Sequence, residues 1–305
     1  QIVNPTTVII NNAGQETIDD TLLNEDDRPR SGYRYWLRRA FVGKDGIDEE
    51  REKENHPWLF LFKQELGRHL GEFIGTFFLV FFIAGIQLNQ SRNLNDQIGN
   101  IDKGMTASLI LTGLIFCFGH VSGAHFNPCV TLGFMLRGAF HFWETCTYIL
   151  VQFAGAVTAA AVLDALFTDQ YGLGMTIPRA TITDKVAFGI EILITFILIT
   201  VVLTTAQNVQ IIGATSGIAV GSTFGACELF AWNFTGASAN PWRSLGPVII
   251  SGEGWNSYWV YIVGPLVGTL CAVVGQRILI NGITRFESAA GKGHNKHSRK
   301  RDKIK

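Results

Sequence analysis

Two asparagine–proline pairs lie in similar surroundings in the two halves of the sequence. Ser122-Gly-Ala-His-Phe-Asn-Pro-Cys129 and Thr235-Gly-Ala-Ser-Ala-Asn-Pro-Trp242 each follow a long apolar segment and precede a short apolar run. Asn is a good helix N-cap, and Pro fits the first helical position because its missing N–H would have had no partner there. Both pairs therefore predict the start of a short helix, whose unpaired N–H groups can orient a polar solute and repel cations.

The elements around these pairs are predicted from apolar runs. Six segments are each long enough to cross about 30 Å of hydrocarbon as a helix. They lie near residues 70–88, 104–123, 142–167, 186–206, 213–231 and 257–279. The runs 127–136 and 240–249 are too short to cross, so they predict half-helices that enter from opposite faces and meet near the midplane. The expected fold is an all-α membrane protein with six transmembrane helices and two half-helices.

An internal repeat relates the two halves of the chain. Glu72-Phe-Ile-Gly-Thr76 in the first span matches Glu191-Ile-Leu-Ile-Thr195 in the fourth, and three spans per half require the second half to insert upside down. A charged side chain inside a span costs about 3 kcal/mol unless it is paired. We therefore expect Glu72 and Glu191 to face the bundle interior and accept backbone N–H groups of the half-helix loops. The alternative is that both lie near span ends and extend to the interface.

These motifs resemble the aquaporin, or major intrinsic protein, family, whose signature is two Asn-Pro-Ala motifs in an inverted repeat. The resemblance covers residues 70–279, and Cys129 and Trp242 replace the two alanines, so the chain is similar to an atypical member. The length of the N-terminal tail and the form of the second motif resemble fungal members. The resemblance implies a homotetramer with one pore in each protomer, passive transport, no cofactor and no enzymatic activity.

The resemblance also implies roles for individual pore residues. Asn127 and Asn240 would be paired amide donors at the midplane, and His125 would line the vestibule. Arg243 would stand at the outer constriction, where it donates hydrogen bonds to the permeating molecule and repels cations and protons. The three other constriction positions fall on Ala107, Glu228 and Ala237. Ala107 removes an aromatic wall found in water-selective members and should widen the pore.

Two of these positions leave alternatives open. Glu228 could form a bidentate pair with Arg243, turn away to cap other backbone, or be displaced from the pore by an offset that brings in Leu229. Trp242 could pack away from the lumen or narrow the pore, since its ring buries on the order of 200 Å² and its N–H needs a partner. Cys129 is a small change in volume that packing can absorb.

Composition excludes several other function classes. The chain has 305 residues and a formal net charge of zero, which argues against a nucleic-acid partner. Its five cysteines have no metal-ligand spacing, so we expect neither a zinc site nor a disulfide framework. The expected function is a passive channel for water and small neutral solutes such as glycerol or hydrogen peroxide. The alternatives are a sealed-pore homologue with a structural role in the membrane and a cation leak created by Glu228.

The ends of the chain are polar and set the expected topology. Residues 1–64 predict a largely disordered cytoplasmic tail, 65–281 the channel domain and 282–305 a basic cytoplasmic tail. Tyr33, Tyr35 and Trp36 form a candidate gate for the cytoplasmic mouth, or only a locally sticky part of the tail. The plasma membrane is the expected location, with lipid as a partner. Asn89 begins an acceptor sequon for glycosylation after the first span.

Overall fold

The computed structural model describes residues 8–10, 16–18, 57–92, 100–167, 172–207 and 215–298. Its contacts divide the chain into two units, Gln1–Lys63 and Gln64–Lys305. In the first unit, strands β1 (Val8–Ile10) and β2 (Glu16–Ile18) pair antiparallel, with Ile9 opposite Thr17. Branched residues favour strands, and Val8, Ile9, Ile10 and Ile18 are branched; the largely disordered tail stays a prediction. Tyr33, Tyr35 and Trp36 lie outside the described residues.

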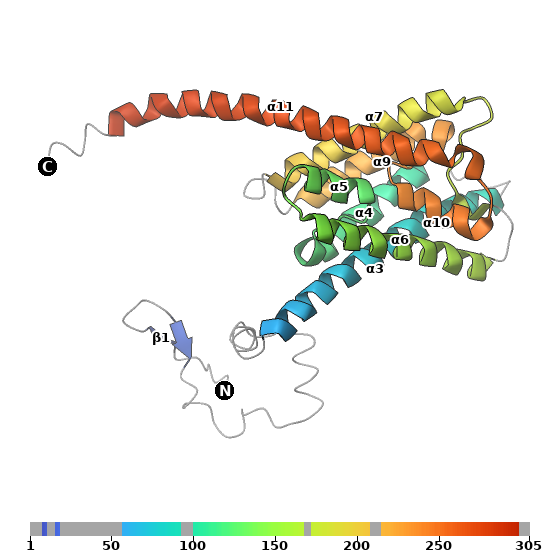
Figure 1. Ribbon diagram of the computed structural model, residues 1–305, viewed down its shortest axis with the longest axis horizontal. Coiled ribbons are helices and arrows are strands. Elements are labelled where there is room, and N and C mark those ends of the chain that lie inside the picture. The colour runs from blue at the N-terminus through green and yellow to red at the C-terminus, as the bar shows by residue number, and fades with distance from the viewer. Residues whose placement is uncertain are drawn as a thin grey trace, which may run out of the picture. The chain divides into compact units, whose positions relative to one another are not determined.

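The described part of the second unit is a bundle of long helices that surround two short ones (Figure 1). The long helices are α3 (Pro57–Arg92), α4 (Asn100–Ser122), α6 (Phe142–Phe167), α7 (Asp184–Gln207), α9 (Ser216–Thr235) and α11 (Tyr258–Ser298). The short helices are α5 (Pro128–Leu136) and α10 (Pro241–Ser251), and the 3-10 turns are η3 (Gly172–Gly174) and η5 (Trp255–Ser257). The all-helical architecture and both half-helices agree with the sequence-based expectation.

Five of the described helices are long and apolar enough to cross a membrane. They are the segments Pro57–Leu88, Ile101–Ser122, Phe142–Phe167, Asp184–Ala206 and Trp255–Leu279. The sixth long helix, α9, has 20 residues but is less apolar, because Glu228 and Asn233 interrupt it. It nevertheless packs against α4 and α7 within the bundle. The six long helices and the two short ones agree with the expected bundle of six spans and two half-helices.

The first and last long helices extend past the spans expected from the sequence, 70–88 and 257–279. α3 begins at Pro57 and continues to Arg92, so the backbone of the sequon at Asn89 is helical rather than part of a loop. α11 continues to Ser298, well beyond residue 279. Apolar composition marks where a helix enters hydrocarbon, whereas backbone hydrogen bonding continues into the polar flanks.

Glycines allow the long helices to pack in close pairs. A Cβ placed on Gly221 of α9 would lie 2.7 Å from the carbonyl oxygen of Ser108 in α4. A Cβ on Gly268 of α11 would lie 2.6 Å from the carbonyl oxygen of Ile192 in α7. Neither position has room for a side chain, so the backbones of α4 and α9, and of α7 and α11, are in direct contact. These contacts fix the walls around the two short helices.

Candidate functional site

The two asparagine caps connect the half-helices to each other. Asn127 Oδ1 accepts from the N–H of Cys129 at 2.9 Å, and Asn240 Oδ1 accepts from the N–H of Trp242 at 3.1 Å. Each side-chain Nδ2 donates across the junction: Asn127 to the carbonyl of Ala239 at 2.8 Å, and Asn240 to the carbonyl of Phe126 at 3.0 Å. An amide nitrogen carries two hydrogens, so the crossed bonds leave one N–H on each asparagine for a solute.

The loops before the caps take a left-handed backbone conformation at alternate residues. Ala124 and Phe126 have φ angles of 53° and 50°, and Ala237 and Ala239 have φ angles of 48° and 49°. A residue with a Cβ pays roughly 1–2 kcal/mol for this conformation. The φ angle is positive at the first and the third residue before each asparagine cap, so the two repeats share the same backbone geometry as well as similar sequences. Groups elsewhere must hold the loops in place.

Glu72 of α3 holds the first loop. Its carboxylate accepts from the N–H of His125 at 2.9 Å and the N–H of Phe126 at 2.8 Å. It also accepts from the Ser122 hydroxyl at 2.8 Å and from Gln152 Nε2 at 2.7 Å. Four donors therefore surround a carboxylate that is fully buried, which is how a buried charge is stabilised.

Glu191 of α7 holds the second loop in the same way. Its carboxylate accepts from the N–H of Ser238 at 3.1 Å, the N–H of Ala239 at 2.9 Å and the Thr235 hydroxyl at 2.7 Å. Both glutamates are fully buried. The expected hydrogen bonds to the loops are present, and the alternative that Glu72 and Glu191 extend to the interface is wrong.

Two tyrosines support the same loops and were not identified from the sequence. The Tyr148 hydroxyl donates to the carbonyl of Ser122 at 2.9 Å, and the Tyr261 hydroxyl donates to the carbonyl of Thr235 at 2.6 Å. Each tyrosine lies 26 residues after its acceptor. That equal spacing within the repeat was a signal in the sequence that could have identified them.

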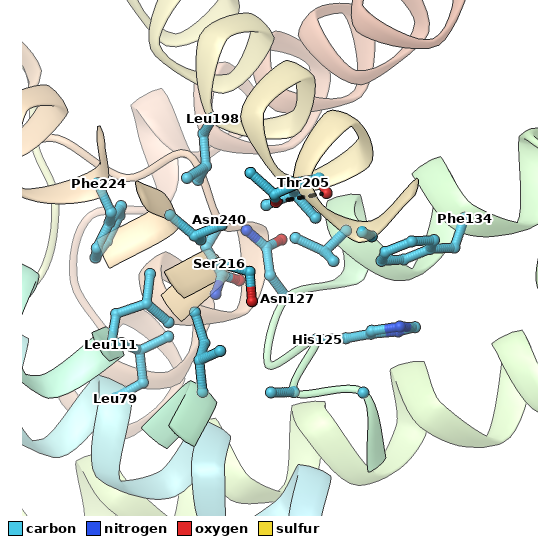
Figure 2. Close-up of a pocket in the computed structure, with 17 residues that line it drawn as sticks. Leu79, Leu111, His125, Asn127, Phe134, Leu198, Thr205, Ser216, Phe224 and Asn240 are labelled. Carbon is cyan, nitrogen blue, oxygen red and sulfur yellow. Dashed lines mark hydrogen bonds between the residues drawn. The ribbon is translucent and has the colours of Figure 1, made fainter. Parts of the chain in front are cut away.

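A cavity of about 100 Å³ leads to the asparagine pair from the side where α7 ends and α9 begins. Figure 2 shows Asn127 and Asn240 together at the cavity, with Leu111 and Phe224 on one side and His125 on another. The walls are mostly apolar, so the two amides are the main polar groups at its end. A volume of this size holds a few water molecules or one small solute.

His125 lines the cavity, where the resemblance placed it. One ring nitrogen, Nδ1, lies 3.1 Å from the Thr131 hydroxyl, and the imidazole stacks on Phe134 with ring centroids 4.7 Å apart. The rings of Phe140 and Tyr148 meet it edge-on. These contacts fix the ring orientation, so the other nitrogen is the polar group that the vestibule can use.

The four expected constriction residues do not line this cavity. The exposed fractions are 1 % for Ala107, 1 % for Glu228, 2 % for Ala237 and 0 % for Arg243. Arg243 Nη1 donates to the carbonyl of Gly174 at 2.9 Å. With the Gln87 amide oriented to satisfy its neighbours, Nη2 donates to its oxygen, and the Gln87 nitrogen donates to Gly174. Two of the five N–H donors of the guanidinium are therefore used by the protein.

Glu228 does not form the expected pair. In the described part of the chain, no ion pair closer than 4.0 Å joins its carboxylate to Arg243. Its Oε1 has no hydrogen-bond partner among these residues, so that oxygen does not cap backbone N–H groups either. Leu229 is 42 % exposed and packs on Gly104, which removes the offset alternative. Arg243 instead turns to η3 and α3, because Gly174 and Gln87 offer it acceptors.

Trp242 packs away from the cavity. Its indole N–H donates to the carbonyl of Ile149 in α6 at 3.0 Å, and its ring meets Phe153 edge-on with centroids 5.4 Å apart. Trp242 does not line the cavity, so the packing alternative is the one the contacts support. Cys129 is fully buried at the start of α5, and its extra volume is absorbed by packing there.

Lys103 is a further residue that the sequence-based expectation missed. Its side chain is 2 % exposed, and its Nζ lies 3.4 Å from the centroid of the Trp232 ring. The sequence-based span began at residue 104, which left this lysine outside. A basic residue four positions before Ala107, on the same face of one helix, was the signal that could have placed it.

Comparison with known proteins gives the same fold. A model of the family "Major intrinsic protein" matches residues 62–275. "Aquaporin NIP1-1" of Zea mays is 37% identical over 212 residues, covering 69% of this chain and 73% of that protein. "Aquaporin NIP1-2" of Oryza sativa subsp. japonica is 33% identical over 248 residues, covering 78% and 79%. These two relatives are plant proteins, and the fungal origin of the chain stays a prediction.

A solved structure matches over most of the described bundle. The "X-ray structure of the aquaglyceroporin from Plasmodium falciparum" has a TM-score of 0.60, with 68% of this chain and 94% of that chain covered. The two sequences are 24% identical. This likeness shows the fold: an all-helical membrane bundle of the aquaporin type.

Proposed function

Because the chain belongs to the major intrinsic protein family, we propose that it is a passive channel for water and small neutral solutes such as glycerol or hydrogen peroxide. The observation that carries the proposal is the pair of crossed asparagine caps at the end of the cavity. Each Nδ2 keeps one N–H for the permeating molecule, and the N-terminal ends of α5 and α10 disfavour cations.

The proposed filter is altered relative to water-selective members. Ala107 and Ala237 contribute only methyl groups, so the walls come from neighbouring side chains. Glu228 and Arg243 place a carboxylate and a guanidinium in one buried region. This combination supports selection of small uncharged solutes that carry hydroxyl groups, since each hydroxyl can both donate and accept.

The proposal includes an assembly and an orientation. The chain is a multi-pass membrane protein, and we propose a homotetramer in the plasma membrane with both termini cytoplasmic. Residues 65–281 would form the channel domain and residues 282–305 the basic tail after it. Basic residues near the ends of the first and last spans support this orientation.

Stopped-flow light scattering on purified protein in lipid vesicles tests the channel. Vesicles with the protein should shrink faster than empty vesicles under a sucrose gradient. A second series with glycerol or urea as the osmolyte should show re-swelling if those solutes pass. Shrinkage at the rate of empty vesicles would contradict the proposed function.

A sealed-pore homologue with a structural role is the second candidate. The near-complete burial of the constriction residues favours it, as do the hydrogen bonds that join Arg243 to Gly174 and Gln87. A Gln87→Ala variant separates the candidates. Recovery of fast shrinkage only in this variant would favour the sealed channel.

A further inference from the structure

The hydroxyl of Thr131 in α5 lies at the centre of three polar contacts. Its Oγ1 is 3.2 Å from the carbonyl oxygen of Asn127, 3.0 Å from Gln152 Nε2 and 3.1 Å from His125 Nδ1. Thr131 is fully buried. A hydroxyl has one hydrogen to donate and two lone pairs that accept. All three contacts are therefore hydrogen bonds only if Thr131 donates once and accepts twice.

Two of the three contacts have a fixed direction. The carbonyl of Asn127 can only accept, so the Thr131 hydroxyl donates to it. Gln152 Nε2 donates, because it also meets the Glu72 carboxylate at 2.7 Å, and the reversed amide would place an oxygen against that carboxylate. If Thr131 donated to His125 instead, its oxygen would face the Asn127 carbonyl with no hydrogen between them. His125 Nδ1 must therefore carry a hydrogen and donate it.

The surroundings of the imidazole favour its neutral form. Its ring contacts are the aromatic rings of Phe134, Phe140 and Tyr148. In the described part of the chain, His125 forms no ion pair with an acid. A charged ring without a paired carboxylate is costly in such surroundings. With one hydrogen on the ring and that hydrogen on Nδ1, the other nitrogen, Nε2, carries a lone pair.

The Nε2 atom lies beside the cavity. A Cβ placed on Gly123 would be 3.3 Å from Nε2, and both Gly123 and His125 line the cavity. Figure 2 shows His125 at the same cavity as Asn127 and Asn240. Among the residues that the structure describes, the ring forms its hydrogen bond through Nδ1 and none through Nε2. Nε2 is therefore the ring atom that a molecule in the cavity can reach.

We infer that Thr131 is a positioning residue that fixes His125 in the tautomer with its hydrogen on Nδ1, so that Nε2 accepts a hydrogen bond from the permeating molecule. The vestibule then presents an acceptor, whereas Asn127 and Asn240 present donors at the end of the cavity. This order favours water and hydroxyl-bearing solutes, because one oxygen can donate at Nε2 and then accept at the amides. The consequence for permeation rests on the proposed channel function, whereas the tautomer does not.

Solid-state ¹⁵N spectra of histidine-labelled protein in lipid vesicles test the tautomer directly. They are recorded at about pH 8, where an ordinary histidine is neutral, and a His125→Asn variant identifies the His125 signals by difference. The wild type should show hydrogen on Nδ1 and none on Nε2. Thr131→Val should lose this pattern, because no acceptor remains for Nδ1, and Thr131→Ser should keep it. Hydrogen on Nε2 in the wild type would overturn the inference, whether or not any variant folds.

Water permeability of the same vesicles tests the consequence. Thr131→Val should lower it by about two- to tenfold, the effect of one ordinary hydrogen bond on a barrier, while Thr131→Ser should stay near the wild-type rate. Thr158→Val removes an exposed hydroxyl that donates to the Ala154 carbonyl and should change neither readout.

The outcomes separate the inference from the proposed function. An unchanged His125 spectrum in a folded Thr131→Val variant would overturn the positioning role of Thr131. A changed spectrum with wild-type water permeability would overturn the role of the tautomer in permeation. Wild-type vesicles that show the expected spectrum but shrink no faster than empty vesicles would instead reject the proposed channel function.

Discussion

Asn127 and Asn240 each donate their side-chain amide to the backbone of the other's loop, at 2.8 and 3.0 Å. Each asparagine therefore has two roles. Its oxygen caps its own half-helix, and its nitrogen donates a hydrogen bond to the loop before the opposite half-helix. The junction of the two repeats is held by polar groups that also end the cavity, so stability and the proposed solute site share the same atoms.

An Asn240→Asp substitution separates the capping role of the side-chain oxygen from the donor role of the side-chain nitrogen. The remaining oxygen can still accept from the N–H of Trp242, while the second oxygen would face the carbonyl of Phe126 and repel it. We expect the free energy of unfolding to fall by about 1–3 kcal/mol and water permeability to fall with it. Thermal unfolding in detergent and stopped-flow shrinkage measure the two effects. Asn256→Asp, at an exposed position, is the matched control and should change neither.

Replacing Glu72 by Gln should weaken the first loop. The new amide would present an NH₂ group to a site where four donors already converge. We expect a loss of about 1.5–3 kcal/mol in the free energy of unfolding, read from denaturation of the purified protein. Glu144→Gln removes the partly exposed ion pair with Arg68 and should cost at most about 1 kcal/mol. Equal losses in the two variants would argue against the loop-holding role.

We expect Trp242 to stabilise the fold by packing against α6 and not to narrow the pore. Trp242→Phe keeps the ring against Phe153 but loses the bond to the Ile149 carbonyl, which should cost about 1 kcal/mol of stability. Trp242→Ala should cost about 3 kcal/mol through the space it leaves. Neither variant should raise water permeability per folded channel. A faster shrinkage of Trp242→Ala vesicles would mean that the indole narrows the pore.

Gln87 should restrict the pore by holding Arg243. Gln87→Ala removes the acceptor of Arg243 Nη2, so the guanidinium gains a further free donor for the permeating molecule. We expect water permeability to rise by up to about tenfold, the effect of about 1.4 kcal/mol in the barrier. Gln64→Ala, at an exposed position of α3, should leave the rate unchanged. An unaltered rate in Gln87→Ala would show that the bridge does not limit flow.

The sequence alone determined the features that depend on local chemistry. Asn followed by Pro favours a helix start, and α5 and α10 begin at the two predicted pairs, with Asn127 and Asn240 as N-caps. A glutamate within an apolar span must find donors inside the protein, so the burial of Glu72 and Glu191 followed. The internal repeat places each glutamate and its half-helix at matching positions in the two halves of the chain.

Only the tertiary structure decided which side chains meet across helices. Glu228 and Arg243 lie in one buried region, yet the rotation of α10 directs the guanidinium to Gln87 and Gly174. Lys103 reaches Trp232 because glycines bring α4 and α9 into contact. Helix starts depend on a few neighbouring residues, whereas these pairings depend on the rotation and register of helices that lie far apart in the chain.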